Sequence, residues 1–356
     1  MELNETIEKI AIKAREASLK LQDTPLDKIN CAFLKMADLL EKRSDFLKQE
    51  NAQDLVLAKE KNLSPAMIDR LTLSDKAIAT MINGLKTVAS LNSPLGTKYD
   101  EYKHPNGLLI YKIKVPVGVV GIIYESRPNV TVDAAAICLK SGNSVILRGG
   151  SEAFHSNIAL AALFSEALES CGINKDSVQM IPVTDHEAVD IMISQDKYID
   201  LIIPRGGERL IRAVVEKSTI PVIKHYKGVC HVYISSHADL TKAISIAVNA
   251  KAQRPGVCNA METLLIDEKL GTEDRKKIIQ ELQKNGITIF GDAKTAALDS
   301  GIKDATESDW EAEYLDLRLA VKTVNGVNEA IEHINKYGSR HTDAIVTESP
   351  EEINAF

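Results

Sequence analysis

The stretch 117-VGVVGIIYE-125 is an almost unbroken apolar run that ends in an acidic residue. Similar runs of valine, isoleucine and leucine recur along the chain, and helical patterns separate most of them. A strand that is buried on both faces carries apolar residues at nearly every position, which is typical of a parallel sheet covered by helices. The stretch and its repeats therefore predict an α/β fold.

The predicted strands fall into two series. After the opening run, the first series comprises 144-SVILR-148, 178-VQMIPV-183, 200-DLIIPR-205 and 221-PVIKHY-226. The second series comprises 230-CHVYIS-235, 263-TLLI-266, 317-LRLAVKTV-324 and 343-DAIVT-347, with helices expected over 239–252, 272–284 and 327–337. We place a domain boundary near Lys227 and Gly228, which predicts two α/β domains with a ligand-binding cleft between them.

Residues 1–92 have a different pattern. Apolar residues such as Ile7 and Ala14 recur there at helical spacing among lysines and glutamates, so this segment is predicted to be helical. Over 108–118, apolar residues then alternate with lysines, which predicts a half-exposed strand. We interpret 97–115 as an arm that extends from the first domain.

The bulk composition is that of an ordinary globular protein. Of the 356 residues, 44% are hydrophobic and 26% are charged. The net charge of -7 and the lack of a long basic tract argue against nucleic acid or an anionic membrane as a partner. No apolar run is long enough for a transmembrane helix. The five cysteines are too irregularly spaced for a disulfide framework, so a cytoplasmic location is expected.

The opening run leads into a polar turn, 125-ESRPN-129, which a helical pattern follows. Ligands of parallel α/β sheets lie at the carboxyl ends of the strands, so Glu125, Arg127 and Asn129 are expected to point toward a cleft. The Asn129 side chain has two interpretations at this point. It could cap the following helix, or its amide N–H could stabilise an oxyanion.

Two other strands end in an arginine that paired glycines follow. Arg148-Gly149-Gly150 precedes one helix, and 204-PRGG-207 precedes another. Paired glycines let the backbone approach a phosphate, a helix N-terminus favours anions, and an arginine adds a full charge. An ordinary tight turn explains either motif alone, but two such turns favour a phosphate-bearing cofactor. The dinucleotide fingerprint GxGxxG is absent.

Cys258 lies in 253-QRPGVCNAMETLLI-266, on a predicted loop between a helix and a buried strand. Arg254 precedes it by four residues. A nearby cation and backbone N–H groups favour the nucleophilic thiolate. This position makes Cys258 the candidate nucleophile of the chain.

The other cysteines are expected to be buried as small hydrophobic residues. They are Cys31, Cys138, Cys171 and Cys230. Three histidines flank predicted strand ends, namely His225, His231 and His341, and nothing in the sequence selects one as the partner of a Cys–His dyad. No CxxC motif or matched histidine pair accompanies them, so no metal site is predicted.

In their order along the chain, these motifs resemble the gamma-glutamyl phosphate reductases of the aldehyde dehydrogenase superfamily. The segments that carry the resemblance are VPVGVVGIIYESRPNVTVDAAAICLKSGNSVILRGG, IDLIIPRGGERL, GVCHVYIS, QRPGVCNAMETLLI and YGSRHTDAIVTE. The resemblance extends from the first helices to about Glu348. It implies an aldehyde-dehydrogenase-like fold of two Rossmann-like domains, with 1–227 binding NADP(H), 228–348 carrying Cys258, and 349–356 starting a return segment.

The resemblance also implies a role for each motif residue. Cys258 matches the nucleophile, and Asn129 matches the amide that holds the oxyanion together with the backbone N–H of Cys258. The residues that match the NADPH site are Glu125, Arg148, Gly149, Gly150, Pro204, Arg205, Gly206 and Gly207. The expected substrate-binding residues are Arg127, Arg254 and Asn259; either arginine could assist the leaving phosphate, bind the substrate carboxylate or form a structural ion pair.

The implied reaction is the NADPH-dependent reduction of L-glutamate 5-phosphate to L-glutamate 5-semialdehyde and phosphate, through a thioester on Cys258. It is the second step of proline biosynthesis from glutamate. Ordinary aldehyde dehydrogenases carry a Glu-Leu-Gly-Gly segment whose glutamate activates the deacylating water, whereas the corresponding 225-HYKG-228 has no carboxylate. The thioester is therefore expected to wait for hydride. The alternatives are an oxidoreductase with hydrolytic deacylation and a non-catalytic binding protein.

The resemblance carries two further expectations. Family members continue beyond Phe356, so the chain is expected to be truncated. The arm over 97–115 implies a homo-oligomer, either a dimer or a tetramer. Functional coupling to a glutamate 5-kinase, which makes the unstable acyl phosphate, is a further partner hypothesis.

Overall fold

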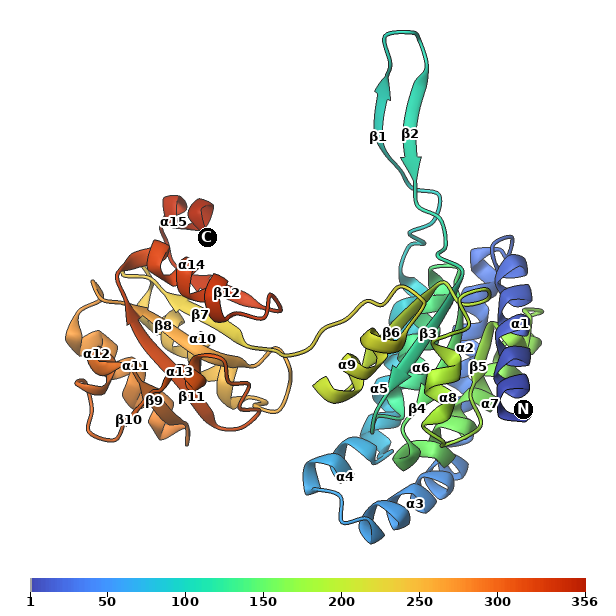
Figure 1. The fold of residues 1–356 in the computed structure, drawn as a ribbon, viewed down its shortest axis with the longest axis horizontal. Coiled ribbons are helices and arrows are strands. Elements are labelled where there is room, and N and C mark those ends of the chain that lie inside the picture. Colours follow the sequence, from blue (N-terminus) through green and yellow to red (C-terminus); the bar gives the residue numbers. More distant parts are fainter. Residues whose placement is uncertain (1) are drawn as a thin grey trace. The chain divides into compact units, whose positions relative to one another are not determined.

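The computed structural model describes residues 2–356, apart from the side chains of residues 65 and 66. It divides into two compact units, Met1–Lys224 (unit 1) and His225–Phe356 (unit 2), as Figure 1 shows. The division lies three residues before the predicted boundary at Lys227-Gly228. Each unit contains its own parallel sheet, so the α/β fold class is confirmed.

Unit 1 begins with five helices. They are α1 (Glu2–Leu21), α2 (Leu26–Lys42), α3 (Ser44–Glu60), α4 (Pro65–Leu71) and α5 (Asp75–Ser90). Pro25 separates α1 from α2 and lies at the N-cap of α2. Ser74 caps α5 by accepting a hydrogen bond from the backbone N–H of Ala77. The helical prediction for residues 1–92 is confirmed for the described residues.

The sheet of unit 1 has four parallel strands in the order β5-β4-β3-β6. The strands are β3 (Val119–Tyr124), β4 (Ser144–Gly149), β5 (Val178–Met180) and β6 (Leu201–Arg205). The helices and short 3₁₀ turns that connect them are α6 (Asn129–Lys140), η1 (Ser151–Ala153), α7 (Phe154–Ser170), η2 (Lys175–Ser177), α8 (Glu187–Met192) and α9 (Glu208–Lys217).

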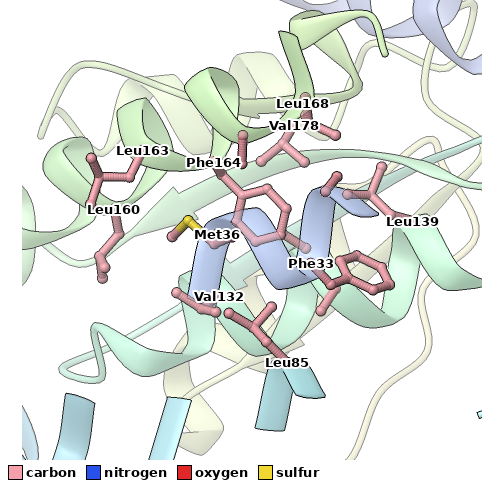
Figure 2. Packing of buried hydrophobic residues seen from close by; sticks show 14 of the residues in the cluster. Phe33, Met36, Leu85, Val132, Leu139, Leu160, Leu163, Phe164, Leu168 and Val178 are labelled. Atoms are coloured by element: carbon pink, nitrogen blue, oxygen red, sulfur yellow. The ribbon is translucent and has the colours of Figure 1, made fainter. Parts of the chain in front are cut away.

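Helices cover both faces of this sheet, as the continuous apolar runs predict. On one face, Val120 and Ile122 of β3 pack with α2, α5, α6 and α7; Figure 2 shows Phe33, Met36 and Phe164 in this core. On the other face, Val119 and Ile123 pack with α1, α8 and α9. Alternate residues of one strand thus enter two separate cores, because successive side chains of a strand point to opposite faces.

Two strand predictions in unit 1 are wrong in part. Over 221–226, only Val222 forms a bridge, to Ile202 of β6, because Pro221 has no N–H to donate. The arm is an antiparallel hairpin of β1 (Lys98–Lys103) and β2 (Leu109–Ile113). Both faces of the hairpin are exposed, whereas the prediction was a strand with one exposed face.

Unit 2 contains a six-stranded parallel sheet in the order β10-β9-β11-β8-β7-β12. Its strands are β7 (Cys230–Ile234), β8 (Met261–Asp267), β9 (Thr288–Gly291), β10 (Lys303–Asp304), β11 (Arg318–Val324) and β12 (Asp343–Val346). Its helices are α10 (Leu240–Ala252), α11 (Thr272–Lys284), α12 (Ala293–Ala296), α13 (Glu307–Trp310), α14 (Gly326–Tyr337) and α15 (Pro350–Ala355). The predicted strands and helices of the second series are confirmed within a few residues, whereas β9, β10, α12 and α13 were missed.

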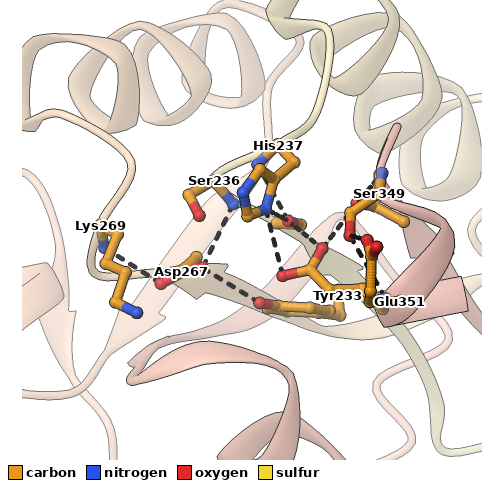
Figure 3. A network of polar contacts seen from close by, with 10 residues as sticks. Tyr233, Ser236, His237, Asp267, Lys269, Ser349 and Glu351 are labelled. Atoms are coloured by element: carbon orange, nitrogen blue, oxygen red, sulfur yellow. Dashed lines mark hydrogen bonds and ion pairs between the residues drawn. The ribbon is translucent and has the colours of Figure 1, made fainter. Parts of the chain in front are cut away.

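Polar side chains tie the carboxyl ends of β7 and β8 to the segment around α15. Figure 3 shows Asp267, which is buried at the end of β8 and accepts hydrogen bonds from the Tyr233 hydroxyl and from the backbone N–H groups of Ser236 and Lys269. Glu352 of α15 accepts from Ser235 and from Thr347. Buried polar groups need such partners, so this network fixes where the chain leaves the sheet.

The cysteine predictions hold only in part. Cys138 and Cys230 are buried, as expected. Cys31 on α2 is exposed and forms a disulfide with the half-buried Cys171 at the end of α7, across a Cα–Cα distance of 6.3 Å. The expectation that Cys31 and Cys171 are buried as small hydrophobic residues is therefore wrong. The sequence spacing hid the pair, since α2 and α7 become neighbours only when both pack on the same core.

No helix within residues 2–356 has the length and apolar character needed to cross a bilayer.

Candidate active site

The candidate nucleophile lies on the segment 253–260, here called the Cys258 loop, which joins α10 to β8. The loop turns twice, through hydrogen bonds from Val257 N to Arg254 O and from Ala260 N to Val257 O. Cys258 is half-buried, while Arg254 and Asn259 are exposed. The predicted loop position of Cys258 is thus confirmed, and Arg254 and Asn259 lie on the same loop.

The backbone of Cys258 packs against the start of β7. The Cys230 thiol donates to the carbonyl oxygen of Cys258, with 3.2 Å between the sulfur and the oxygen. A Cβ added at Gly228 would lie 1.9 Å from the same oxygen, which is far inside contact distance. The glycine of 225-HYKG-228 is therefore required by the close approach of the Cys258 carbonyl.

Cys230 is suited to donate this hydrogen bond. Burial, more than the nearby Asp343 carboxylate, raises the pKa of the Cys230 thiol to about 12, so the group stays protonated at neutral pH. Its sulfur also lies 3.8 Å from Nδ1 of His341, whose ring contacts that of His225. Cys230 thus contacts a histidine and also holds the carbonyl of the Cys258 loop.

A carboxylate approaches the same place from a distant part of the sequence. Glu313, in the segment before β11, accepts a hydrogen bond from the backbone N–H of Gly228 at 2.9 Å. The segment 225-HYKG-228 has no acidic residue of its own, but tertiary folding brings one beside it. Sequence reasoning missed Glu313 because it considered carboxylates only within that segment.

In unit 1, predicted site residues meet at the carboxyl ends of β3 and β6. The Glu125 carboxylate accepts from the backbone N–H of Gly207, the N-cap residue of α9, at 2.9 Å. Ser126 has φ of +42° and donates through both its N–H and its hydroxyl to Glu152. Glu152 was not predicted, although it lies two residues after the first Arg-Gly-Gly turn.

Asn129 is the first residue of α6, and Pro128 occupies the N-cap position. The Asn129 amide donates to Asp133, one turn along, at 2.9 Å, and it does not cap the helix. The capping interpretation is therefore wrong, because the proline shifts the start of the helix by one residue. Burial raises the pKa of Asp133, and the Asn129 hydrogen bond opposes that shift. Arg127 lies half-buried in the turn before α6.

Arg148 is buried, with 5% of its surface exposed. Its guanidinium donates to the backbone carbonyls of Gly149, Thr184 and Asp185, at 2.9, 3.0 and 3.0 Å. Burial lowers the pKa of Arg148, and the nearby carboxylates Glu152 and Asp185 oppose that shift. The arginine therefore joins the turn after β4 to the segment after β5.

The glycines of both turns are constrained by their neighbours. A Cβ on Gly149 would lie 2.1 Å from the amide nitrogen of Asn157, and one on Gly150 would lie 2.3 Å from Glu152. A Cβ on Gly206 would lie 2.6 Å from the Glu125 carboxyl carbon. At three of the four paired glycines a Cβ would therefore displace the end of a neighbouring polar side chain. Pro204 is buried within β6 and Arg205 is exposed at its end.

A cavity of about 500 Å³ lies beside the first Arg-Gly-Gly turn. Leu57, Phe154, Pro182 and Val183 supply apolar walls, and Lys61, Ser151, His155, Thr184 and Asp185 supply polar groups. Within residues 2–356, no group of three or more histidines, cysteines or carboxylates is arranged to hold a metal ion. A concave site that combines apolar walls with several polar groups can hold a small molecule or a cofactor.

The profile of the Aldehyde dehydrogenase family matches residues 3–301, which is most of the chain. The chain belongs to the aldehyde dehydrogenase family. It is therefore an oxidoreductase of that family, which uses a nicotinamide cofactor. The family resemblance seen in the sequence is confirmed.

Similar proteins show which members of the aldehyde dehydrogenase family this chain resembles. A gamma-glutamyl phosphate reductase of Desulfatibacillum aliphaticivorans is 50% identical over 349 residues, covering 98% of this chain and 84% of that protein. The one of Geobacter metallireducens is 51% identical over 347 residues, covering 98% and 83%. The crystal structure of gamma-glutamyl phosphate reductase from Thermotoga maritima has a TM-score of 0.93 and 42% identity, covering 98% of this chain and 84% of that one.

Within this aldehyde dehydrogenase, the sequence motifs located the loop and strand ends but not the residues that support them. Thr184 and Asp185 follow a predicted strand, so the rule that ligands lie at carboxyl ends could have found them. Lys61 directly follows α3 and His155 lies in the first turn of α7, and their place beside the cavity depends on tertiary packing.

Proposed function

We propose that this chain reduces gamma-glutamyl phosphate to glutamate 5-semialdehyde and phosphate, with NADPH as the reductant. The observation that carries the proposal is its identity of about one half, along 98% of the chain, to two gamma-glutamyl phosphate reductases. The loop position of Cys258 and the fold match to a solved member of the same group support it. The product belongs to the route from glutamate to proline.

The first chemical step is acyl transfer to Cys258. The thiolate attacks the acyl carbon of the substrate, the bond from that carbon to the phosphate oxygen breaks, and phosphate leaves with the electron pair. A thioester on Cys258 remains. Phosphate is already a good leaving group, so the step needs little help from a general acid. We assign Arg254 and Asn259, on the Cys258 loop, and Arg127 to binding the substrate.

Asn129 and the backbone N–H of Cys258 are assigned to the oxyanion of the tetrahedral intermediate. An amide NH₂ group carries two hydrogens, and one of those on Asn129 is directed to Asp133. This bond fixes the orientation of the side chain, which leaves the second N–H for the oxyanion. A preorganised donor of this kind is worth about 10² to 10³ in kcat.

A bound NADPH supplies the hydride that reduces the thioester. The cavity beside the Arg-Gly-Gly turn fits the adenosine end of such a molecule, since Leu57 and Phe154 offer apolar walls to a flat ring. Arg148 donates to three backbone carbonyls, so we assign it to shaping the turn and assign the ribose phosphate to Lys61 and His155. Glu125, Pro204, Arg205, Gly206 and Gly207 remain proposed for the pyrophosphate and nicotinamide end.

Cofactor preference is tested by initial rates. We expect Lys61→Gln to raise the KM for NADPH and to leave the KM for NADH nearly unchanged, because only NADPH carries the extra phosphate. Lys59→Gln is the matched control, since Lys59 is also an exposed lysine near the end of α3. An equal effect of both variants on NADPH would contradict the assignment.

The reaction itself is tested in reverse. The protein is incubated with glutamate 5-semialdehyde, phosphate and NADP⁺, and formation of NADPH is followed by absorbance. We expect turnover that requires phosphate and that Cys258→Ala abolishes. Turnover without phosphate would support hydrolytic deacylation, and Glu313 would then be the first carboxylate to replace. No turnover under any of these conditions would contradict the function.

A homo-oligomer, dimeric or tetrameric, is also proposed. It is supported by the hairpin of β1 and β2, whose Tyr99, Tyr102 and Leu109 are more than 40% exposed. Functional coupling to a glutamate 5-kinase would shorten the life of the unstable acyl phosphate in water. The cytoplasm is the proposed location, although reductants there act against a disulfide such as Cys31–Cys171. Cell fractionation tests the location, and co-purification tests the coupling to a glutamate 5-kinase.

A further inference from the structure

A fully buried ion pair spans the Cys258 loop. Lys251, in the last turn of α10, and Glu262, the second residue of β8, have no exposed side-chain surface, and Nζ lies 2.6 Å from Oε2. The loop leaves α10 next to Lys251 and enters β8 next to Glu262. The pair therefore closes the base of the loop.

This arrangement is costly for stability alone. Burial lowers the pKa of Lys251 and raises the pKa of Glu262, and each charge opposes the shift of the other. Two charges that are moved out of water lose the free energy of their hydration, and only a close, well-oriented contact between them offsets this loss. Apolar residues of similar size in their place often stabilise a protein at least as much. The pair is thus better explained by the geometry that it imposes than by the stability that it adds.

The pair also reaches the other side of the Cys258 loop. The second oxygen of Glu262 accepts from the backbone N–H of Leu315 at 3.2 Å, and Leu315 has the uncommon φ of +52°. Two residues earlier, Glu313 accepts from the N–H of Gly228. Gly228 in turn packs against the carbonyl of Cys258. One continuous set of contacts therefore runs from the buried pair to the backbone of the nucleophile.

We propose that Lys251 and Glu262 are positioning residues that clamp both ends of the Cys258 loop and, through Leu315 and Glu313, set the place of the Cys258 backbone. The inference rests on the proposed role of Cys258 as nucleophile. Neither side chain touches the substrate. Both act by fixing the geometry from which the thiolate attacks, and small displacements of a reacting group slow a reaction strongly.

The test is the double variant Lys251→Met/Glu262→Gln. It removes both charges together, so no buried charge is left alone, and glutamine keeps an oxygen for the Leu315 N–H. We expect faster amide hydrogen exchange confined to 253–260 and 313–315, and a loss in kcat of about 100-fold. The KM for NADPH should stay within about twofold, because the cofactor residues are unchanged.

Two controls separate positioning from general stability. Lys294→Met/Glu268→Gln removes an exposed pair of the same unit, with the same distance of 2.6 Å, and should behave as the parent. Ile279→Val weakens the buried core of α11 and should lower the melting temperature without changing exchange in the loop. Glu262→Gln alone leaves the Lys251 charge buried without a carboxylate and offers one acceptor oxygen for two contacts, so it should be at least as impaired as the double variant.

The outcomes distinguish this inference from the proposed function. Unchanged exchange in the loop, or faster exchange with unchanged kcat, would overturn the clamp. A double variant that loses kcat only in proportion to its unfolded fraction would show a structural role alone and would also overturn it. A parent protein with no reductase turnover would contradict the proposed function, while the exchange measurement would still test the clamp.

Discussion

Cys230 and Cys258 are brought together by folding but differ in environment. The buried Cys230 keeps its proton, because burial raises its pKa to about 12, and it donates to the Cys258 carbonyl. Cys258 is half-buried on a loop. The loop position could be predicted from sequence because Pro255 and Gly256 precede Cys258 and a buried strand follows. The hydrogen bond between the two cysteines could not, because it joins residues 28 positions apart.

Gly228 gives a sharp prediction at the residue scale. In Gly228→Ala the new methyl group would meet the Cys258 carbonyl oxygen at 1.9 Å, so the Cys258 loop must move. We expect kcat to fall about 100-fold and the free energy of unfolding to fall by about 1–3 kcal/mol. Enzyme kinetics and urea denaturation measure the two effects.

Gly84→Ala is the control for this variant. Gly84 lies inside α5, and the nearest atom to an added Cβ is 3.7 Å away. Alanine should raise stability there by up to about 1 kcal/mol, because glycine is a poor helix former. Full activity in Gly228→Ala would show that the Cys258 loop tolerates displacement.

His333 gives a prediction for the dependence of stability on pH. Burial against Trp310, Tyr337 and His231 lowers the pKa of His333 to about 3, and the positive charges of Lys322 and Lys336 act in the same direction. In the unfolded chain its pKa is about 6.5. Between these values the unfolded state binds a proton that the folded state does not, so stability is lost as the pH falls.

The expected slope is up to about 1.4 kcal/mol of unfolding free energy per pH unit between about pH 6.5 and pH 3. His333→Phe should make the acid side of the stability curve shallower, because phenylalanine fits the aromatic surroundings and binds no proton. Urea denaturation at pH 7, 5.5 and 4 measures the free energy of unfolding of both proteins. His104→Gln, at an exposed position, should leave the curve unchanged. Parallel curves for His333→Phe and the parent would contradict the prediction.

At the scale of elements, the periodicity of apolar residues predicted the long helices and the long buried strands, and it failed for short strands. The helices of residues 2–92 and the strands β3, β4, β7, β8 and β11 have long apolar patterns. The missed strand β10 has only two residues, both exposed, so no pattern marks it. The segment 221–226 looked like a strand but lies beside β6 through a single bridge. Edge segments depend on their neighbours more than on their own residues.

The Cys31–Cys171 disulfide links two helices of unit 1. The bond closes a loop with a sequence separation of 140, and a cross-link of that span restricts the unfolded chain strongly. Reduction should therefore lower the free energy of unfolding by up to about 5 kcal/mol. Thermal melts with and without dithiothreitol measure the loss. Cys31→Ser should melt like the reduced parent and should not respond to dithiothreitol; a parent that is equally insensitive would contradict the prediction.

At the scale of the whole molecule, the hairpin of β1 and β2 is the feature that the fold of one chain does not explain. A two-stranded hairpin is marginally stable by itself in water, and this one exposes Tyr99, Tyr102, Leu109, Tyr111 and Ile113. A second copy of the chain is the partner that the proposed homo-oligomer supplies. The edges and the apolar side chains of the hairpin would then be covered.

Replacing the apolar side chains of the hairpin should separate the subunits. We expect Leu109→Ser/Tyr111→Ser/Ile113→Lys to reduce the mass measured by light scattering to that of one chain, 39.0 kDa. Leu34→Ser, at a position of α2 that is 51% exposed, should leave the mass of the assembly unchanged. A parent protein that already has the mass of one chain would contradict the oligomer.

The sequence by itself determined the α/β class, the order of the main strands and the loop that carries Cys258. These follow from local periodicity and turn residues, which act over a few neighbours in the chain. Tertiary structure alone decided that Arg148 donates to backbone carbonyls, that Glu313 lies beside Gly228, and that Lys251 and Glu262 close the Cys258 loop. The contacts of Arg148 with Thr184, of Glu313 with Gly228 and of Lys251 with Glu262 join residues that lie 36, 85 and 11 positions apart, beyond the reach of a local pattern. Burial gives such contacts their strength because water no longer competes for the same polar groups.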